Sequence, residues 1–261
     1  EIASCLVGSE MCIRDRSLDA NDLYVADNPE NGDYDHDVAG IGSDYTGVNA
    51  HTDAQGTGIV RILNPTNLQQ NNFFFWGHDN GAINASNVVD YPSSEGVQGR
   101  LQRVWRVTKT GGDSIGFDIR FDLSSISGSK AAEDLVLLID TDNDGVFSDE
   151  TVSSGGLVMG ATDVSDDIFQ FSNVTALGNT GYEHLRFTLG TSDISTTVLP
   201  VELVSFSADI VKGGLVELNW MLASELDNDY FTIERSNDSK NWIEVEAVSY
   251  THLRAHETRG N

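Results

Sequence analysis

Residues 140–150 read Asp-Thr-Asp-Asn-Asp-Gly-Val-Phe-Ser-Asp-Glu, and their spacing is the strongest chemical signal in the sequence. Asp140, Asp142 and Asp144 alternate and Gly145 follows, which matches the first half of a D-x-D-x-D-G calcium loop. Such a loop curls round the ion, so every second side chain points inward and glycine permits the sharp turn. Carboxylate oxygens are hard ligands that suit calcium. The sequence therefore predicts a calcium site here.

The second half of this loop departs from the calcium pattern. The carbonyl of Val146 can supply another oxygen, but position twelve is Thr151 instead of a bidentate glutamate. Ser148, Asp149 or Glu150 would have to complete the coordination. The alternative is an acid-rich hairpin turn, because Asp-Gly and Asn-Asp pairs favour turns without any ion.

A second acidic cluster contains Asp33, Asp35 and Asp37 at alternate positions. Alternation would place the three carboxylates on one strand face or around a metal ion, and their mutual repulsion would favour a cation. A solvated loop with a turn at Asn31-Gly32 explains the same residues. The sequence favours this second interpretation.

Basic and aromatic residues give two weaker signals. A basic group at every third position contains Arg100, Arg103, Arg106 and Lys109. It could bind an anion or a partner, but we expect it to pair across strands with Asp118 and Asp122. Of the tryptophans, Trp105 and Trp220 lie in alternating strands typical of a core. Trp76 and Trp242 remain candidates for stacking on sugar rings.

Catalytic signatures are few in this sequence. It contains no Gly-x-Ser-x-Gly elbow, no His-Glu-x-x-His and no phosphate-binding loop. His36 and His78 each neighbour an aspartate, and we interpret both as structural or surface residues. We therefore expect no enzyme. A hydrolase with a carboxylate pair stays an alternative, because aspartate and glutamate are so abundant.

The elements that must position these residues are strands. In residues 114–124 apolar and polar side chains alternate, as they do in 184–190, which predicts strands with one buried face. Residues 135–140 form a short continuous apolar run, typical of a strand that is covered on both faces. Further strands are expected at 57–63, 71–77, 101–109, 156–161 and 167–172. The one weak helical candidate lies at 130–134.

Many short strands separated by turns predict an all-β fold, an antiparallel β-sandwich, over residues 17–198. Near Pro200 a new strand pattern begins. Residues 199–247 resemble the opening strands of an immunoglobulin-like or fibronectin-like β module. Such a fold needs about seven strands over ~100 residues, so we expect this module to be truncated.

Both ends of the sequence are expected to be foreign to the protein. A codon choice exists for residues 5–16 whose reverse complement encodes residues 248–258. We interpret both stretches as translated sequencing adapter, which makes 1–16 and 248–261 non-native and the chain a metagenomic fragment. Both cysteines, Cys5 and Cys12, fall in the adapter, so thiol chemistry is excluded from the rest.

Composition limits the partners of this chain. A net charge of −26 repels nucleic acid and anionic lipid. No stretch approaches the roughly 20 apolar residues that span a bilayer, so membrane insertion is not expected. An acidic surface suits an exterior rich in divalent cations.

Residues 199–245 are similar to a module of surface and secreted proteins of the type nine (Por) secretion system, where it often precedes the C-terminal sorting domain. The resemblance rests on Leu-Pro-Val-Glu-Leu (199–203), Leu-Asn-Trp (218–220) and Tyr-Phe-Thr-Ile-Glu-Arg-Ser (230–236). The first domain resembles uncharacterised β domains that often follow concanavalin-like lectin domains in such proteins. The segments that carry this second resemblance are 36–44, 73–81, 103–111 and 137–149.

These resemblances imply a secreted or cell-surface location and a modular architecture, not an activity. We therefore expect a non-enzymatic structural or interaction module, stabilised by calcium and joined to neighbouring domains of a longer chain. The alternative is a carbohydrate-binding or adhesin module of a polysaccharide-degrading protein, whose partner would be an extracellular glycan.

Overall fold

The computed structural model describes residues 24–26, 32–44, 50–56, 59–83, 86–126, 128–179, 184–194, 196–197, 203–211, 215–222, 230–236 and 242–249. Contacts divide the chain into two compact units, residues 1–224 and 225–261. The expected domain limits at residues 17, 198 and 247 stay predictions. So does the adapter interpretation, because residues 5–16 and 250–258 lie outside the described residues.

The first unit contains an antiparallel β-sandwich, which confirms the predicted all-β class. Its large sheet has the strand order β11-β10-β14-β8-β5-β1-β2, and β7 and β6 extend it beside β14. The bounds are β1 His36–Ser43, β2 Ala50–His51, β5 Phe73–His78, β6 Ser86–Asn87, β7 Gly99–Leu101, β8 Trp105–Thr110, β10 Leu135–Asp140, β11 Leu157–Val158 and β14 Arg186–Thr191.

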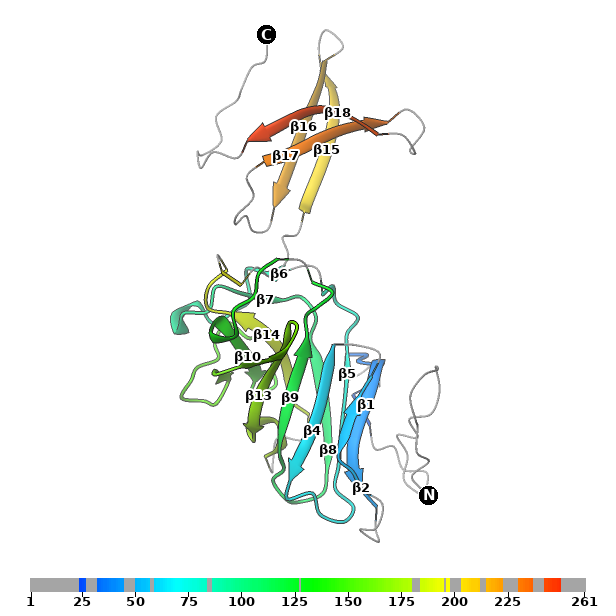
Figure 1. Cartoon of the computed structure of the whole chain (residues 1–261), viewed down its shortest axis with the longest axis vertical. Coiled ribbons are helices and arrows are strands. Elements are labelled where there is room, and N and C mark those ends of the chain that lie inside the picture. The colour runs from blue at the N-terminus through cyan, green and yellow to red at the C-terminus, as the bar shows by residue number, and fades with distance from the viewer. Residues whose placement is uncertain are drawn as a thin grey trace. The chain divides into compact units, whose positions relative to one another are not determined.

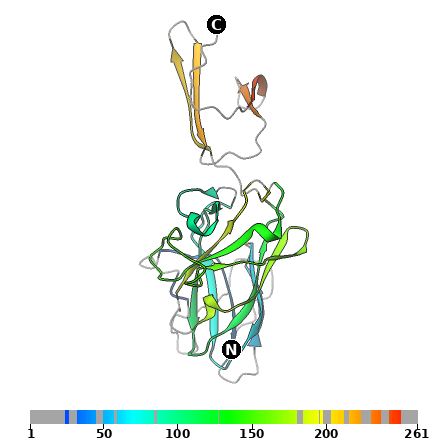
Figure 2. The same ribbon diagram turned by 90° about the vertical axis from the view of Figure 1, so that its left-hand side faces the viewer.

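The small sheet has the strand order β12-β13-β9-β4-β3. Its strands are β3 Asp53–Gln55, β4 Val60–Thr66, β9 Gly116–Asp122, β12 Thr162–Ser165 and β13 Ile168–Val174. In Figure 1, β4 and β9 of the small sheet run in front of β5 and β8 of the large sheet, and Figure 2 shows the domain turned by 90°. Within the described residues there are also three short 3₁₀ turns: η2 Ser93–Glu95, η3 Ala132–Asp134 and η4 Ala176–Gly178.

The main core lies between the two sheets. Phe117, Ile119 and Phe121 of β9 are fully buried and face it, as the alternating pattern predicts. The ring of Phe121 meets Trp105 of the large sheet edge-on, with 5.8 Å between the ring centroids. Trp105 in turn stacks on Phe187, so aromatic side chains from β8, β9 and β14 join the two layers.

A second apolar cluster covers the outer face of the large sheet. It includes Tyr24 and Tyr34 from the N-terminal segment and Phe147 from the loop after β10. These side chains pack over Leu138 and Val136, so all six residues of β10 are buried. This confirms the prediction that residues 135–140 form a strand covered on both faces.

The expected pairing of the basic group with Asp118 and Asp122 is wrong. The basic residues lie on β7 and β8 or between them, whereas Asp118 and Asp122 belong to β9 of the other sheet. The chain crosses from one layer to the other after β8 instead of forming a hairpin. The basic side chains therefore find partners within their own layer.

Residues 203–249 contribute two separate hairpins. Strand β15 (Leu203–Val211) pairs with β16 (Leu215–Leu222), and β17 (Tyr230–Ser236) pairs with β18 (Trp242–Ser249), both in antiparallel fashion. The immunoglobulin-like assignment of this region stays a prediction. Throughout the described ranges, no helix has the length and apolar character needed to cross a membrane.

Candidate cation site

The predicted calcium loop, residues 140–150, begins where β10 ends, and we call it the aspartate loop. Asp140 is the last residue of β10 and is fully buried, while Asp142 and Asp144 are exposed. One carboxylate oxygen from each lies within 4.8 Å of the others. Among the described residues, this is the one group of three or more acidic, histidine or cysteine side chains gathered so closely.

Backbone hydrogen bonds to the aspartates curl this loop. The N–H groups of Asp144 and Gly145 donate to the two Asp140 carboxylate oxygens, at 3.1 and 2.9 Å. The Val146 N–H donates to Asp144 at 2.7 Å. Gly145 has a φ of +91°, which a residue without a Cβ adopts without strain. The turn that the sequence predicts is therefore formed, and it directs the carboxylates toward one point.

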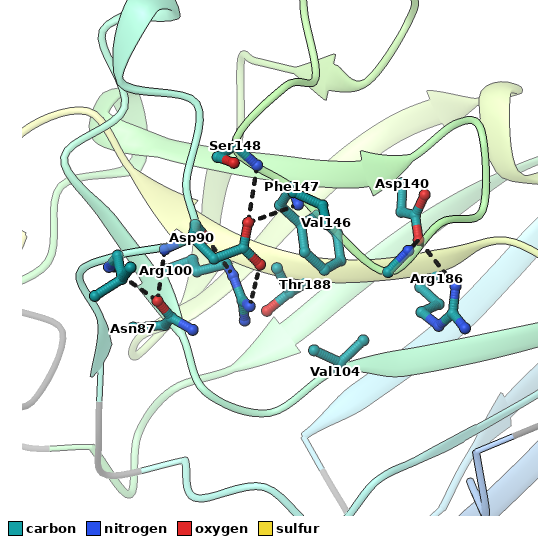
Figure 3. Close-up of polar contacts among 12 residues, drawn as sticks. Asn87, Asp90, Arg100, Val104, Asp140, Val146, Phe147, Ser148, Arg186 and Thr188 are labelled. Atoms are coloured by element: carbon teal, nitrogen blue, oxygen red, sulfur yellow. Dashed lines mark hydrogen bonds and ion pairs between the residues drawn. The ribbon is translucent and has the colours of Figure 1, made fainter.

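Arg186 of β14 supplies a positive charge beside this point (Figure 3). Its Nη1 donates to Asp140 Oδ2 at 3.0 Å and to both the carbonyl and side-chain oxygens of Asn143, at 3.0 and 2.9 Å. Burial raises the pKa of Asp140, and hydrogen bonds from Gly145 and Arg186 oppose that rise in part. The guanidinium thus balances the buried carboxylate, while Asp142 and Asp144 remain open to solvent.

The second half of the loop is held by Asp90 and Arg100. Asp90 Oδ1 accepts the N–H groups of Phe147 and Ser148 at 2.8 and 2.9 Å. Its Oδ2 pairs with Arg100 at 2.8 Å, and the Arg100 guanidinium lies 4.8 Å from the Phe147 ring centroid. Figure 3 shows this clamp beside the Asp140–Arg186 pair. Sequence reasoning missed Asp90, because nothing local connects it with a loop more than fifty residues away.

The clamp also orients a backbone oxygen of the loop. Because a trans peptide is planar, the Val146 carbonyl points opposite to the Phe147 N–H, and therefore away from Asp90. Burial opposes ionisation of Asp90, but hydrogen bonds from Arg100 and from the Phe147 and Ser148 backbone outweigh it and lower its pKa. Asp90 is therefore an ionised carboxylate that stabilises the loop. It does not belong to the close carboxylate group of Asp140, Asp142 and Asp144.

Glu150 does not complete the coordination. It is 4% exposed and accepts hydrogen bonds from the backbone and hydroxyl of Thr141, at 2.5 and 2.7 Å, and from Ser154 at 3.0 Å. The prediction of Glu150 as a metal ligand is wrong, because its carboxylate ties the ends of the loop together. Ser148 and Asp149 are exposed, and Asp149 is not part of the close carboxylate group.

The second predicted cluster, Asp33, Asp35 and Asp37, is not brought together. Asp35 pairs with His36 at 2.6 Å and Asp37 with His78 at 2.9 Å. Asp33 and Asp37 have φ values of +60° and +50°, so the regular alternation of a strand is interrupted at both ends of the cluster. That interruption is why side chains at alternate positions do not converge on one ion.

His78 is a structural residue, consistent with our interpretation of the sequence. Its side chain is 2% exposed. Its Nδ1 accepts the Asn80 N–H at 2.9 Å, which leaves the proton on Nε2 to be donated to Asp37 at 2.9 Å. Burial lowers the pKa of His78, and the bond to Asp37 opposes that shift. Both ring nitrogens are occupied, so this histidine has no lone pair for a substrate.

The two tryptophan candidates differ sharply in exposure. Trp76 is 1% exposed and packs in the sandwich core near Phe74. The prediction that Trp76 stacks on a sugar is wrong, because its position in β5 turns the ring inward. Trp242 in β18 is 58% exposed, so a sugar platform there stays a prediction.

Residues 17–176 match the family described as Domain of unknown function (DUF8202), and the chain belongs to this family. No curated protein and no solved structure matches the chain.

Proposed function

We propose that this chain is a non-enzymatic structural and interaction module of a secreted or cell-surface bacterial protein, stabilised by calcium at the aspartate loop. The observation that carries the proposal is the convergence of Asp140, Asp142 and Asp144 within 4.8 Å on a preformed turn. Three carboxylates at this distance repel one another, and a divalent cation would relieve the repulsion. Calcium would then link the end of β10 to the following loop.

The same geometry predicts weak binding. Position twelve is Thr151 and Glu150 is turned inward, so the cage lacks the bidentate glutamate of tight calcium loops. Arg186 adds a positive charge next to Asp140. Water would complete the coordination, together with the Val146 carbonyl. We therefore expect a dissociation constant of about 10⁻⁴–10⁻³ M, the range of extracellular modules.

Three features support the location and class in this proposal. The net charge of −26 suits a medium rich in divalent cations. Residues 199–245 resemble a module of type nine secretion proteins, in which neighbouring domains of the same chain are the natural partners. The buried histidine, His78, is committed to Asp37 and Asn80, which argues against a role as general base.

Thermal unfolding in calcium tests the proposal. At 10 mM calcium a site of about 1 mM affinity adds about 1.4 kcal/mol, or roughly 3–6 °C in melting temperature. The variant Asp142→Asn with Asp144→Asn should lose this gain but keep its stability in chelator, since both residues are exposed. A matched control replaces exposed Asp163 and Asp166 by asparagine and should keep the gain. Equal melting of the wild type in calcium and in chelator would refute the calcium site.

A further inference from the structure

The outward face of the small sheet carries a polar row that crosses all five strands. Neighbouring members of the row are direct register partners: Gln55, Arg61, Arg120, Gln170 and Thr162. The residues that alternate with them, such as Ile62 and Ile119, are buried in the core. The row is therefore the solvent side of the sheet, and none of its members is needed to fill the sandwich.

Two arginines lie directly opposite each other in this row, on β4 and β9. Like charges at opposed positions destabilise a sheet unless something neutralises them. Asp53 of β3 neutralises Arg61 through a two-pronged bond, with Nε–Oδ1 at 2.7 Å and Nη2–Oδ2 at 2.6 Å. Arg120 has no such partner.

The guanidinium of Arg120 is anchored at one nitrogen only. Its Nε donates to Gln170 Oε1 at 2.7 Å, while its two terminal nitrogens make no hydrogen bond or ion pair with any described residue. The nearest carboxylates along β9 are engaged elsewhere. Asp118 accepts from Asn64 at 2.9 Å, and Asp122 accepts from the Ser124 hydroxyl at 2.6 Å. In a chain with 41 acidic and 15 basic residues, an arginine whose terminal nitrogens have no acidic partner among the described residues is unusual.

The fork borders a small hollow in the sheet surface. The hollow is lined by Gln55, Ile59, Arg61, Arg120, Asp122 and Ile168 and has a volume of about 50 Å³. One water needs about 10–15 Å³, so the space suits one carboxylate-sized group with little more. A whole sugar ring would have to lie over the rim.

We propose that this arginine hollow binds the carboxylate of a uronic-acid unit in an acidic polysaccharide. A planar carboxylate matches the planar arginine fork and can take two parallel hydrogen bonds from it. A sugar hydroxyl would donate a hydrogen bond to Asp122, which lines the hollow and accepts the described Ser124 bonds through Oδ1 only. The site is separate from the aspartate loop and does not depend on calcium.

The surrounding acids select for this class of ligand. Asp53, Asp118 and Asp122 lie on the same face as the arginines and would repel a densely charged chain such as a nucleic acid or a heavily sulfated glycan. A sugar with one carboxylate per ring meets less of that repulsion, and one of its hydroxyls can donate to Asp122, whose Oδ1 alone accepts the Ser124 bonds. The mixed charge of the face therefore favours a polyol with a single charge per unit.

Calorimetric titration with a galacturonate hexamer in chelator tests the inference and excludes calcium bridging. We expect binding to the wild type, none to the fully methyl-esterified hexamer, and at least a tenfold loss in Arg120→Gln. Arg235→Gln, which removes an exposed arginine from β17, is the charge-matched control and should bind normally. No binding by the wild type, unchanged binding by Arg120→Gln, or equal binding of the ester would each overturn the inference.

A gain of binding gives a readout that loss of folding cannot imitate. Asp53→Asn removes the carboxylate that occupies Arg61, so both guanidinium groups become available to the ligand. We expect this variant to bind the hexamer several-fold more tightly than the wild type. Weaker or equal binding by Asp53→Asn would contradict the role of the arginine pair.

Discussion

The Nε of Arg186 donates to the hydroxyl of Tyr34 at 3.1 Å, although the two residues are 152 positions apart in the sequence. The same guanidinium pairs with the buried Asp140. One arginine thus fixes the N-terminal segment over the large sheet and also fixes the start of the aspartate loop. The guanidinium of Arg106, the register partner of Arg186, lies 5.8 Å from the Tyr34 ring centroid and extends this buried contact.

Replacing Arg186 by methionine should be strongly destabilising. The change leaves the Asp140 carboxylate buried without its cation, and breaking a buried pair in this way costs about 3–5 kcal/mol. Tyr34→Phe removes one hydrogen bond and should cost about 1 kcal/mol. Chemical denaturation of the purified variants measures both free energies of unfolding.

A double variant separates the pair from general damage. In Arg186→Met with Asp140→Asn neither member of the pair leaves its partner's charge uncompensated, so the loss should be clearly smaller than the sum of the two single losses. Strictly additive losses would show that the two side chains do not depend on each other.

Asp90→Asn should loosen the second half of the aspartate loop. It leaves Arg100 buried without a counter-charge, so we expect a loss of about 3 kcal/mol in free energy of unfolding. Asp79 offers a matched control. It accepts two backbone N–H groups, from Gly81 at 2.8 Å and Val104 at 3.1 Å, but forms no direct salt bridge within the described residues. Asp79→Asn should cost about 1 kcal/mol or less, and equal losses would contradict the importance of the Asp90–Arg100 pair.

The sequence predicts the strands well wherever the side-chain pattern itself reports burial. The alternation around Phe117 and Phe121 and the apolar run at 135–140 correspond directly to β9 and β10. The turn of the aspartate loop is predicted equally well, because Gly145 and the alternating aspartates act over a few residues. Short-range patterns of this kind depend on local geometry alone.

Several of the misses concern partners that are distant in sequence. No local pattern predicts that the chain changes sheets between Thr110 and Gly116. This change of sheet separates the basic group from Asp118 and Asp122. Nor does any pattern bring Arg186 or Asp90 to the aspartate loop, because each comes from another part of the chain. The prediction for Trp76 was wrong for a related reason, because the sheet that covers β5 determines which way this side chain points.

Gly178 should tolerate no side chain. A Cβ at this position would lie 1.9 Å from the backbone oxygen of Ile115, and that backbone cannot move freely because Ile115 N–H donates to the Gly178 carbonyl at 2.9 Å. We expect Gly178→Ala to cost about 3 kcal/mol or more, beyond the usual 1–3 kcal/mol of overpacking. Thermal unfolding measures the loss. Gly112→Ala is the control, because a Cβ there meets nothing within 4 Å; equal melting of the two variants would refute the clash.

The burial of His78 should make the stability of the protein depend on pH. Its pKa is lowered by burial, with the bond to Asp37 opposing the shift, so it lies below the unfolded value of about 6.5. Between these two pKa values the unfolded chain binds more protons than the folded one. Stability is therefore full above pH 6.5 and is lost as the pH falls through this window, by at most about 1.4 kcal/mol per pH unit for this group.

Denaturation curves at pH 7 and pH 5 measure this loss, and a variant assigns it to one residue. His78→Gln should be less stable than the wild type at pH 7, because the bonds to Asp37 and Asn80 are disturbed. It should lose less stability than the wild type between pH 7 and pH 5, since the buried titrating ring is gone. His51→Gln, at an exposed position in β2, should retain the wild-type pH dependence. An identical fall in the wild type and in His78→Gln would place the pH sensitivity in other groups.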